Sequence, residues 1–396
     1  MSASTIERAR PHMTSLTTEL IRAGAIRSRE WTHVFGDVPR HLFVPRWFQQ
    51  DQNERGITVW REHRGAATDD DLEAVYRDQT LVTALDPDTA ERVDDTAWTG
   101  IPTSSSTLPS LMAGMLEDLT VKDGHRVLEV GTGTGYNAAL LSARLGEHLV
   151  HSVDIDPDTI RDAREHLASA GFVPQVVAGD GTRGYPEGGT FDRIIATCSV
   201  PVVPAAWIEQ SEPGTIIVAD IALGIEGGLV RLKVDDRGRA AGRFTTTAGR
   251  FMAARSEAKK YPPRQGPERA PETGTLPSAV SAADIRAHYA FRLLLSVSLP
   301  EAELVYHLDD AGNTSLQIHG PDGSWARAAL AGDHAWTITY GGDPGLWRQV
   351  EAAWLWWCKA GRPSHDTFTY TREADGRAYA SYAPDGSRWN LPTVRA

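Results

Sequence analysis

The sequence contains very little cysteine and no long apolar run. Only two of its 396 residues are cysteines, Cys198 and Cys358. They lie far apart and neither has a partner at metal-ligand spacing, which argues against a disulfide framework and against a zinc site. No stretch of about 20 apolar residues is present, so no helix is predicted to cross a bilayer. The histidines are also scattered, and we expect free thiols and no bound metal.

Basic residues are fewer than acidic ones: the sequence has 40 Lys and Arg and 52 Asp and Glu, which gives a net charge of -12. Because nucleic-acid binding depends on clustered cations, this balance argues against a nucleic-acid partner and favours a peptide or a small substrate. The first residues, Met1 to Met13, lack an apolar segment followed by small residues, so a cytoplasmic location is expected. The oligomeric state leaves no signature in the sequence.

The length of the chain exceeds that of one ordinary core and predicts two domains. Five prolines fall between residues 261 and 278, where neither a helix nor a central strand is expected. We interpret 261–278 as a linker between a catalytic domain, residues 1–260, and a tryptophan-rich α+β domain, residues 279–396. Two helices, at 13–25 and 28–35, would form a helical lead-in to the first domain.

Short apolar runs alternate with helical stretches between residues 126 and 221, which is typical of a parallel sheet built from strand–helix–strand units. The best delimited helix is expected at 157–170, with Asp156 as its cap and Gly171 beyond its end. Runs at 229–234 and 243–247 flank an Asp-Gly turn and predict an antiparallel hairpin. Strands are expected at 126–130, 149–155, 175–178, 191–198 and 214–221. The fold class is therefore α/β, a doubly wound, Rossmann-like sheet with a mixed edge.

Two helices are expected in the C-terminal part, at 281–297 and 345–360. The second carries an apolar stripe at helical spacing, formed by Trp347, Val350, Trp354 and Trp357. We interpret the stripe as core, although a groove for a partner peptide would use the same pattern. No catalytic constellation is recognisable in this part.

The most informative segment is an apolar strand that runs into three glycines, Gly131, Gly133 and Gly135, and then into a helix. Glycines at this point let the backbone turn tightly and approach a ligand closely. A dinucleotide fingerprint would place the third glycine one residue later. Glu129, just before the glycines, would repel a phosphate and attract a cationic amino group or sulfonium. The segment therefore favours S-adenosyl-L-methionine over a nicotinamide dinucleotide as the cofactor.

Two further acidic residues follow the next two strands. Asp154 ends the first of them, where a carboxylate can accept both ribose hydroxyls, and Asp180 follows the second, where it can hold an adenine edge. Each motif also has a plainer interpretation, as a strand-to-helix turn, a helix cap or a Gly-Asp-Gly turn. All three lie at strand ends, so we predict a single cofactor site. Its residues would be Glu129, Gly131, Thr132, Gly133, Gly135, Tyr136, Asn137, Asp154, Ile155, Asp180 and Gly181.

A run of hydroxyl side chains, residues 103–107, precedes an apolar helix. Methyl transfer from a sulfonium to a carboxylate needs alignment and exclusion of water rather than acid–base help, because the acceptor is already an anion. Hydroxyls and a helix amino terminus can hold such an anion. We predict Thr107, Ser106 and Ser105 as catalytic residues; the alternative is a serine-rich loop with one capping hydroxyl.

Over about residues 13–235 the sequence resembles the protein-L-isoaspartate O-methyltransferase family. The resemblance rests on the segments 38–45 (VPRHLFVP), 76–78 (YRD), 128–136 (LEVGTGTGY), 179–181 (GDG) and 191–197 (FDRIIAT). It implies methyl transfer from S-adenosyl-L-methionine to the α-carboxylate of an isoaspartyl residue, whose ester then closes to a succinimide. In that family a Ser-Gln-Pro or similar triplet carries the hydroxyl nearest the carboxylate, and Thr107-Leu108-Pro109 falls on it here.

The substrate side departs from the family pattern more than the cofactor side. Residues 81–88 and an acidic insert replace a glycine-rich loop. The hydroxyl run, Asn137 and the long tail look more like the actinobacterial branch associated with ribosomally made modified peptides such as lanthipeptides. There an ordinary Asp of a macrocyclic precursor peptide is esterified, and the ester collapses to aspartimide. This tailoring role is our first hypothesis, general isoaspartyl repair is the alternative, and a degenerate cofactor-binding module or a nicotinamide oxidoreductase are hypotheses of other classes.

Overall fold

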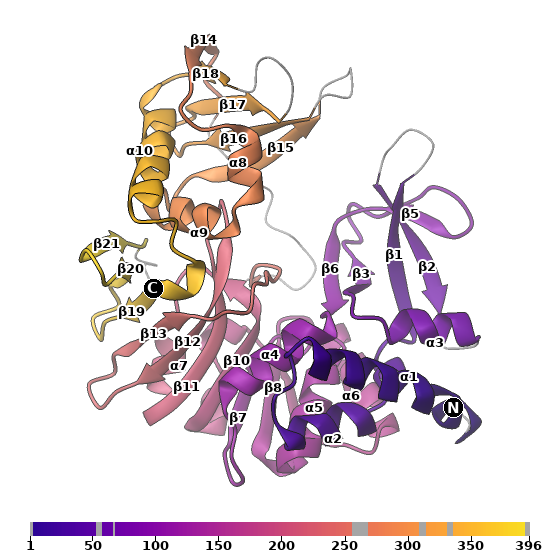
Figure 1. The fold of residues 1–396 in the computed structure, drawn as a ribbon. Helices are drawn as coiled ribbons and strands as arrows, with labels where there is room; N and C mark the ends of the chain where they lie inside the picture. The colour runs from indigo at the N-terminus through magenta and orange to yellow at the C-terminus, as the bar shows by residue number, and fades with distance from the viewer. Residues whose placement is uncertain are drawn as a thin grey trace.

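The structure is a computed structural model, shown in Figure 1. It describes residues 3–52, 58–65, 68–255, 268–308, 314–330 and 336–392. The described strands form three sheets of ten, six and five strands, named here the central, N-terminal and C-terminal sheets. No helix in these ranges is long and apolar enough to cross a membrane.

The parallel half of the central sheet carries the strands that the sequence predicted. These are β7 (Val127–Val130), β8 (Val150–Asp154), β9 (Gln175–Ala178), β10 (Phe191–Val200) and β11 (Ser211–Ala222). They pair in the order β11-β10-β7-β8-β9, all parallel. All four residues of β7 are buried, as expected for a strand covered on both faces. The carboxyl ends of β7, β8 and β10 therefore meet at one edge of the sheet.

Helices cover this half of the sheet, and two of them begin at a side-chain cap. They are α1 (Ala3–Arg22), α2 (Arg29–Asp37), α4 (Pro109–Leu119), α5 (Tyr136–Leu145), α6 (Pro157–Ser169) and α7 (Ala205–Glu209). The Asp156 carboxylate accepts a hydrogen bond from the Asp158 amide at 3.0 Å, and Ser28 caps α2 in the same way. The predicted Asp156 cap is confirmed. Short 3₁₀ turns lie at Arg40–Phe43, Glu147–Leu149, Gly181–Arg183, Pro186–Gly188 and His365–Thr367.

The antiparallel edge of the central sheet is longer than predicted. The expected hairpin is present as β12 (Gly227–Val234) and β13 (Ala240–Phe244), which confirms the mixed edge. Beyond β13 the sheet continues with β19 (Thr369–Arg372), β20 (Ala378–Tyr382) and β21 (Ser387–Asn390). These last strands cover an edge that would otherwise expose unpaired backbone groups.

The C-terminal sheet has the order β14-β18-β17-β16-β15 and packs against helices. Its strands are β14 (Glu272–Pro277), β15 (Glu303–Leu308), β16 (Thr314–His319), β17 (Trp325–Ala329) and β18 (Thr337–Gly341), and its helices are α8 (Ala282–Ala287), α9 (Tyr289–Ser298) and α10 (Gly345–Lys359). The prediction of a single helix at 281–297 is wrong, because the backbone of His288 is extended and separates α8 from α9. The tryptophan stripe of α10 is buried, so the core interpretation is confirmed.

The predicted linker is partly a strand. Residues 272–277 form β14 at the edge of the C-terminal sheet, where proline is tolerated, whereas residues 261–267 lie outside the described ranges. One hydrophobic core contains both Leu128 of β7 and Leu391 near the C-terminus. The division into 1–260, 261–278 and 279–396 stays a proposal, and the first and last of these parts contribute to one sheet and one core.

The N-terminal sheet was not expected from the sequence, which predicted only a helical lead-in. Its strands are β1 (Arg46–Gln52), β2 (Thr58–Arg64), β3 (Leu81–Leu85), β4 (Glu91–Arg92), β5 (Ala97–Thr99) and β6 (Pro102–Ser106), and α3 (Asp69–Val75) lies beside it. Most side chains of β1 are exposed, so the apolar alternation that marks a strand is missing. Figure 1 shows this sheet at the right, with β6 on the side toward the central sheet.

Candidate active site

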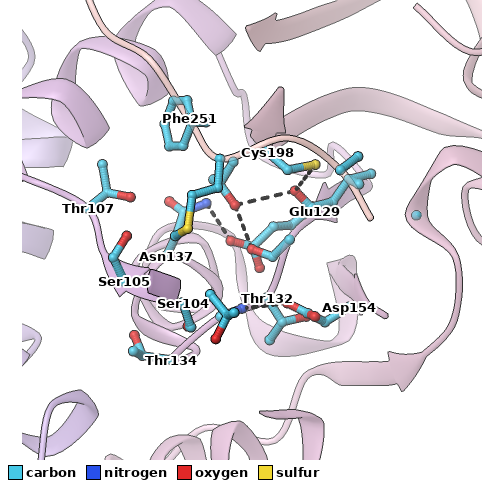
Figure 2. Close-up of a pocket in the computed structure, with 18 of the residues that line it drawn as sticks. Ser104, Ser105, Thr107, Glu129, Thr132, Thr134, Asn137, Asp154, Cys198 and Phe251 are labelled. Carbon is cyan, nitrogen blue, oxygen red and sulfur yellow. Dashed lines mark hydrogen bonds between the residues drawn. The ribbon is translucent and has the colours of Figure 1, made fainter. Parts of the chain in front are cut away.

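A cavity of about 340 Å³ lies at the carboxyl ends of β7, β8 and β10. Its other walls are β6 of the N-terminal sheet and residues 250–255, which follow β13. Ligands of open α/β sheets bind outside the carboxyl ends of the strands, so this is the expected place for a cofactor. Figure 2 shows the cavity with the side chains that line it.

Glu129 of β7 is completely buried and is held by two hydrogen bonds. Its carboxylate accepts from Asn137 Nδ2 at 2.7 Å and from Ser152 Oγ at 2.5 Å. Burial raises the pKa of Glu129 to about 7. Both Glu129 and Asn137 line the cavity, and the Asn137 Oδ1 atom is buried without a hydrogen-bond partner in the described structure. The Glu129 carboxylate and the unpaired Asn137 oxygen lie at one wall of the cavity, and together they fit a bound cationic amino group.

The first two glycines of the motif line the cavity, whereas the third lies where two helices pack together. A Cβ atom at Gly131 would lie 2.6 Å from the Thr197 hydroxyl, so only glycine lets the chain pass there. The Gly133 amide donates to Asp154 Oδ2 at 2.9 Å, which links the loop after β7 to the end of β8. Gly135 does not line the cavity. Its φ of +86° starts α5 where the helix packs against α6, so its assignment to the cofactor does not follow from the structure.

Asp154 and Asp180 both reach the cavity, and each also has a local role. Asp154 is largely buried, and burial raises its pKa even though it accepts the Gly133 amide. Asp180 Oδ1 accepts from the Thr182 amide at 2.9 Å and from the Thr182 hydroxyl at 2.6 Å. These bonds agree with the plainer interpretation of the motif as a Gly-Asp-Gly turn. Thr132, Tyr136, Ile155 and Gly181 also line the cavity. The predicted cofactor residues, Gly135 excepted, therefore meet in one place, and their roles remain predictions.

The hydroxyl run forms strand β6 and not a loop. Its residues line the cavity, and Figure 2 shows Ser104, Ser105 and Thr107 along one side of it. Ser106 is buried, and its hydroxyl lies 3.4 Å from two nitrogens of Arg40. Successive side chains of a strand point to opposite faces, so Ser106 and Ser105 differ in direction. Thr107 and Ser105 are therefore the better placed of the three predicted catalytic residues.

The position of Thr107 depends on two other motifs. The buried Arg40 guanidinium donates to five backbone carbonyls, those of Val75, Arg77, Gln79, Ser106 and Thr107. Asp78 Oδ1 accepts the Ser110 amide at 2.8 Å at the start of α4. These contacts hold the end of β6 and the amino terminus of α4 on either side of Leu108, and they connect the 38–45 and 76–78 segments with the predicted catalytic residues.

The wall formed by residues 250–255 was not predicted from the sequence. This segment runs beside β10, where the Ser199 amide donates to the Met252 carbonyl and the Ala254 amide to the Ser199 carbonyl, both at 2.9 Å. It brings Arg250, Phe251 and Arg255 to the cavity. The segment has no helical or strand periodicity, and the available signal was its pair of arginines in an acidic chain.

The sequence matches a known protein family over the segments that form this cavity. A model of the family described as "Protein-L-isoaspartate(D-aspartate) O-methyltransferase (PCMT)" matches residues 72–255, which includes the 250–255 segment. The protein-L-isoaspartate O-methyltransferase of Hyperthermus butylicus is 32% identical over 216 residues, covering 52% of this chain and 73% of the relative. That of Thermococcus onnurineus is 30% identical over 205 residues, covering 51% and 74%. The chain belongs to this family.

Membership in the protein-L-isoaspartate O-methyltransferase family confirms the enzyme class and the cofactor predicted from the sequence, a carboxyl methyltransferase dependent on S-adenosyl-L-methionine. A solved structure described as a protein-L-isoaspartate O-methyltransferase covers 94% of this chain with 99% of its own, at a TM-score of 0.51 and 21% identity. At this identity the likeness shows the fold. In the described ranges, no group of three or more His, Cys, Asp or Glu residues is arranged to hold a metal.

Proposed function

We propose that this enzyme methylates the α-carboxylate of isoaspartyl residues in peptides and proteins. The observation that carries the proposal is the meeting of the Glu129–Asn137 wall with the hydroxyls of Ser105 and Thr107 in one cavity. When bound, S-adenosyl-L-methionine supplies a methyl group on a sulfonium, which is a good leaving group. Glu129 and Asn137 would hold the amino group of the cofactor, and Asp154 would hold the ribose.

The acceptor side of the cavity is suited to a carboxylate. The hydroxyls of Ser105 and Thr107 can donate to it, and Arg250 and Arg255 bring positive charge to the same cavity. Because a carboxylate is already the nucleophile at neutral pH, no side chain has to remove a proton. The protein's task is to orient the anion and exclude water, which buried walls and hydroxyl donors do.

A narrower candidate is tailoring of a macrocyclic precursor peptide of the lanthipeptide type, with an ordinary Asp as acceptor and aspartimide as product. Strands β3 and β6 border the cavity where the family pattern has a glycine-rich loop, and this altered wall favours a specialised acceptor. The C-terminal part of the chain gives weaker support to the tailoring candidate. A solved structure described as a protein-L-isoaspartate O-methyltransferase matches 94% of this chain in fold, so the additional residues are not particular to a tailoring enzyme.

Mass spectrometry with S-adenosyl-L-methionine and three peptides separates the candidates: a linear isoaspartyl peptide, its aspartyl isomer and a cyclised aspartyl peptide. Methyl ester or loss of one water on the isoaspartyl peptide is expected. Modification of the cyclised aspartyl peptide alone would favour tailoring, and bound cofactor without modification of any peptide would favour a degenerate binding module.

Replacing Thr107 with Val tests the acceptor site, because the change removes the hydroxyl and keeps the volume. We expect kcat/KM for the isoaspartyl peptide to fall about 10- to 100-fold, the range for one lost hydrogen-bond donor. Thr107→Ser, which keeps the hydroxyl, should stay within about threefold of the wild type. The dissociation constant of S-adenosylhomocysteine, measured by calorimetry, should not change in either variant. Wild-type kinetics in Thr107→Val would remove Thr107 from the site.

A further inference from the structure

The loop between β11 and β12 contains a buried carboxylate that touches two arginines. Glu226 is 8% exposed, and its Oε2 atom accepts from Arg292 Nε at 2.8 Å. Its Oε1 atom lies 3.9 Å from Nη1 of Arg250. Arg292 belongs to α9 in the C-terminal part of the chain, whereas Arg250 lines the active-site cavity. Glu226 therefore connects the C-terminal part with the cavity wall.

Helix α9 holds this loop by more than the ion pair. The Ser296 hydroxyl accepts the Glu226 amide at 3.2 Å and donates to the Glu226 carbonyl at 2.8 Å, and the Tyr289 hydroxyl donates to the Gly227 carbonyl at 2.8 Å. A Cβ atom at Gly224 would lie 2.3 Å from the Ala302 carbonyl oxygen. The loop is thus packed against the C-terminal part without spare room, and Glu226 has a defined position.

The residue after Arg250 is fixed from the same side. The Phe251 amide donates to Asp220 Oδ2 at 2.9 Å, and Asp220 is completely buried in β11. The backbone at 250–251 is therefore anchored, while the Arg250 side chain is 52% exposed and has freedom to turn. The Glu226 carboxylate, 3.9 Å away, can orient it, and the buried Asp220 carboxylate adds negative charge nearby.

The balance of charge around Glu226 decides how strongly it holds Arg250. Because Arg292 makes the short contact, it partly neutralises the carboxylate, and Arg250 stays at the longer distance of 3.9 Å. A guanidinium held loosely can still pair with the carboxylate of an acceptor. Without Arg292 the full charge of Glu226 would draw Arg250 toward the loop and away from the acceptor.

We propose that Glu226 and Arg292 are positioning residues, through which the C-terminal part of the chain orients Arg250 toward the carboxylate of the acceptor peptide. This inference rests on the proposed function. It assigns to the C-terminal part a role in every turnover, whichever peptide is methylated.

Binding of an isoaspartyl peptide to the enzyme saturated with S-adenosylhomocysteine tests the proposal. Arg292→Met should raise the peptide dissociation constant about tenfold, because Glu226 then draws Arg250 away from the acceptor. Glu226→Gln should raise it by a similar factor, because Arg250 is then no longer oriented. Both effects lie within the range of coupling between residues that contact each other. In an Arg250→Ala background the same changes should have an effect of less than about twofold, because their target is gone. Arg348→Met, which removes an exposed arginine of α10, is the matched control and should bind like the wild type.

Three results would overturn the proposal: peptide binding unchanged in both variants, an equal loss in the Arg250→Ala background, or an equal loss of S-adenosylhomocysteine affinity. If Arg292→Met does not fold, Glu226→Gln decides alone, because it keeps the volume of the loop. A wild-type enzyme that binds the cofactor product and no isoaspartyl peptide would instead contradict the proposed function, and the inference with it.

Discussion

Replacing Glu129 with Gln is expected to weaken binding of S-adenosyl-L-methionine about 10- to 100-fold. Hydrogen bonds to charged groups contribute about 1.5–3 kcal/mol, and Gln removes the charge while it keeps the shape. Glu129 is buried beside Asn137, so little water is present to replace the lost interaction. Isothermal titration calorimetry at pH 8 measures the effect. An unchanged dissociation constant would show that the cation lies elsewhere.

The pH dependence of the same titration gives a second test with a fixed sign. Burial raises the pKa of Glu129 to about 7, so the free enzyme carries a proton there at lower pH. A bound cation favours the ionised carboxylate and lowers this pKa, which means that binding releases a proton. Affinity should therefore fall about tenfold per pH unit below about pH 7 and level off above it. Glu129→Gln should flatten this profile; a profile that is flat in the wild type would contradict the assignment.

Arg40→Met is expected to cost about 3–5 kcal/mol of unfolding free energy. The guanidinium is completely buried and serves five carbonyls, which would lose their donor together. Burial already lowers the pKa of Arg40 to about 10. Arg40→Lys should recover only part of the loss, because one ammonium cannot reach carbonyls spread around a planar fork.

Urea unfolding of both variants measures this effect. Arg46→Met is the control, since the Arg46 side chain is half exposed and its partner Glu62 keeps a second arginine, Arg64, so stability should change by less than about 1 kcal/mol. If Arg40→Met were as mild as Arg46→Met, the Thr107 carbonyl and its neighbours would not depend on Arg40.

The parallel half of the fold was predictable because each of its elements is marked locally. β7 is apolar throughout, and α6 is bounded by Asp156 and Gly171. The meeting of Glu129 and Asp154 in one cavity was predictable for the same reason, since both stand at the ends of such strands. Local sequence decides these elements, and tertiary packing agrees with it.

The N-terminal sheet and the 250–255 segment were not predictable in the same way. The exposed strand β1 is held by cross-strand pairs such as Arg61 with Asp51, which sequence periodicity does not reveal. The 250–255 segment gains its place from hydrogen bonds to Ser199 and Asp220, which are distant in the sequence. The addition of β19 to β13 is likewise decided by a tertiary contact.

The shared sheet changes how the C-terminal part can be studied. Deleting residues 279–396 would remove the strand that pairs with β13 and the arginine that pairs with Glu226. Loss of activity in such a deletion would therefore say nothing about peptide selection. Single substitutions at the Glu226 contact are the informative changes.

A crystal structure of the enzyme with S-adenosylhomocysteine and an isoaspartyl peptide tests the central claim most directly. We expect the amino group of the cofactor product at Glu129 and Asn137, its ribose at Asp154, and the peptide carboxylate within hydrogen-bond distance of Thr107 or Ser105. A peptide carboxylate bound away from β6, or a cofactor product that does not contact the Glu129 wall, would contradict the account.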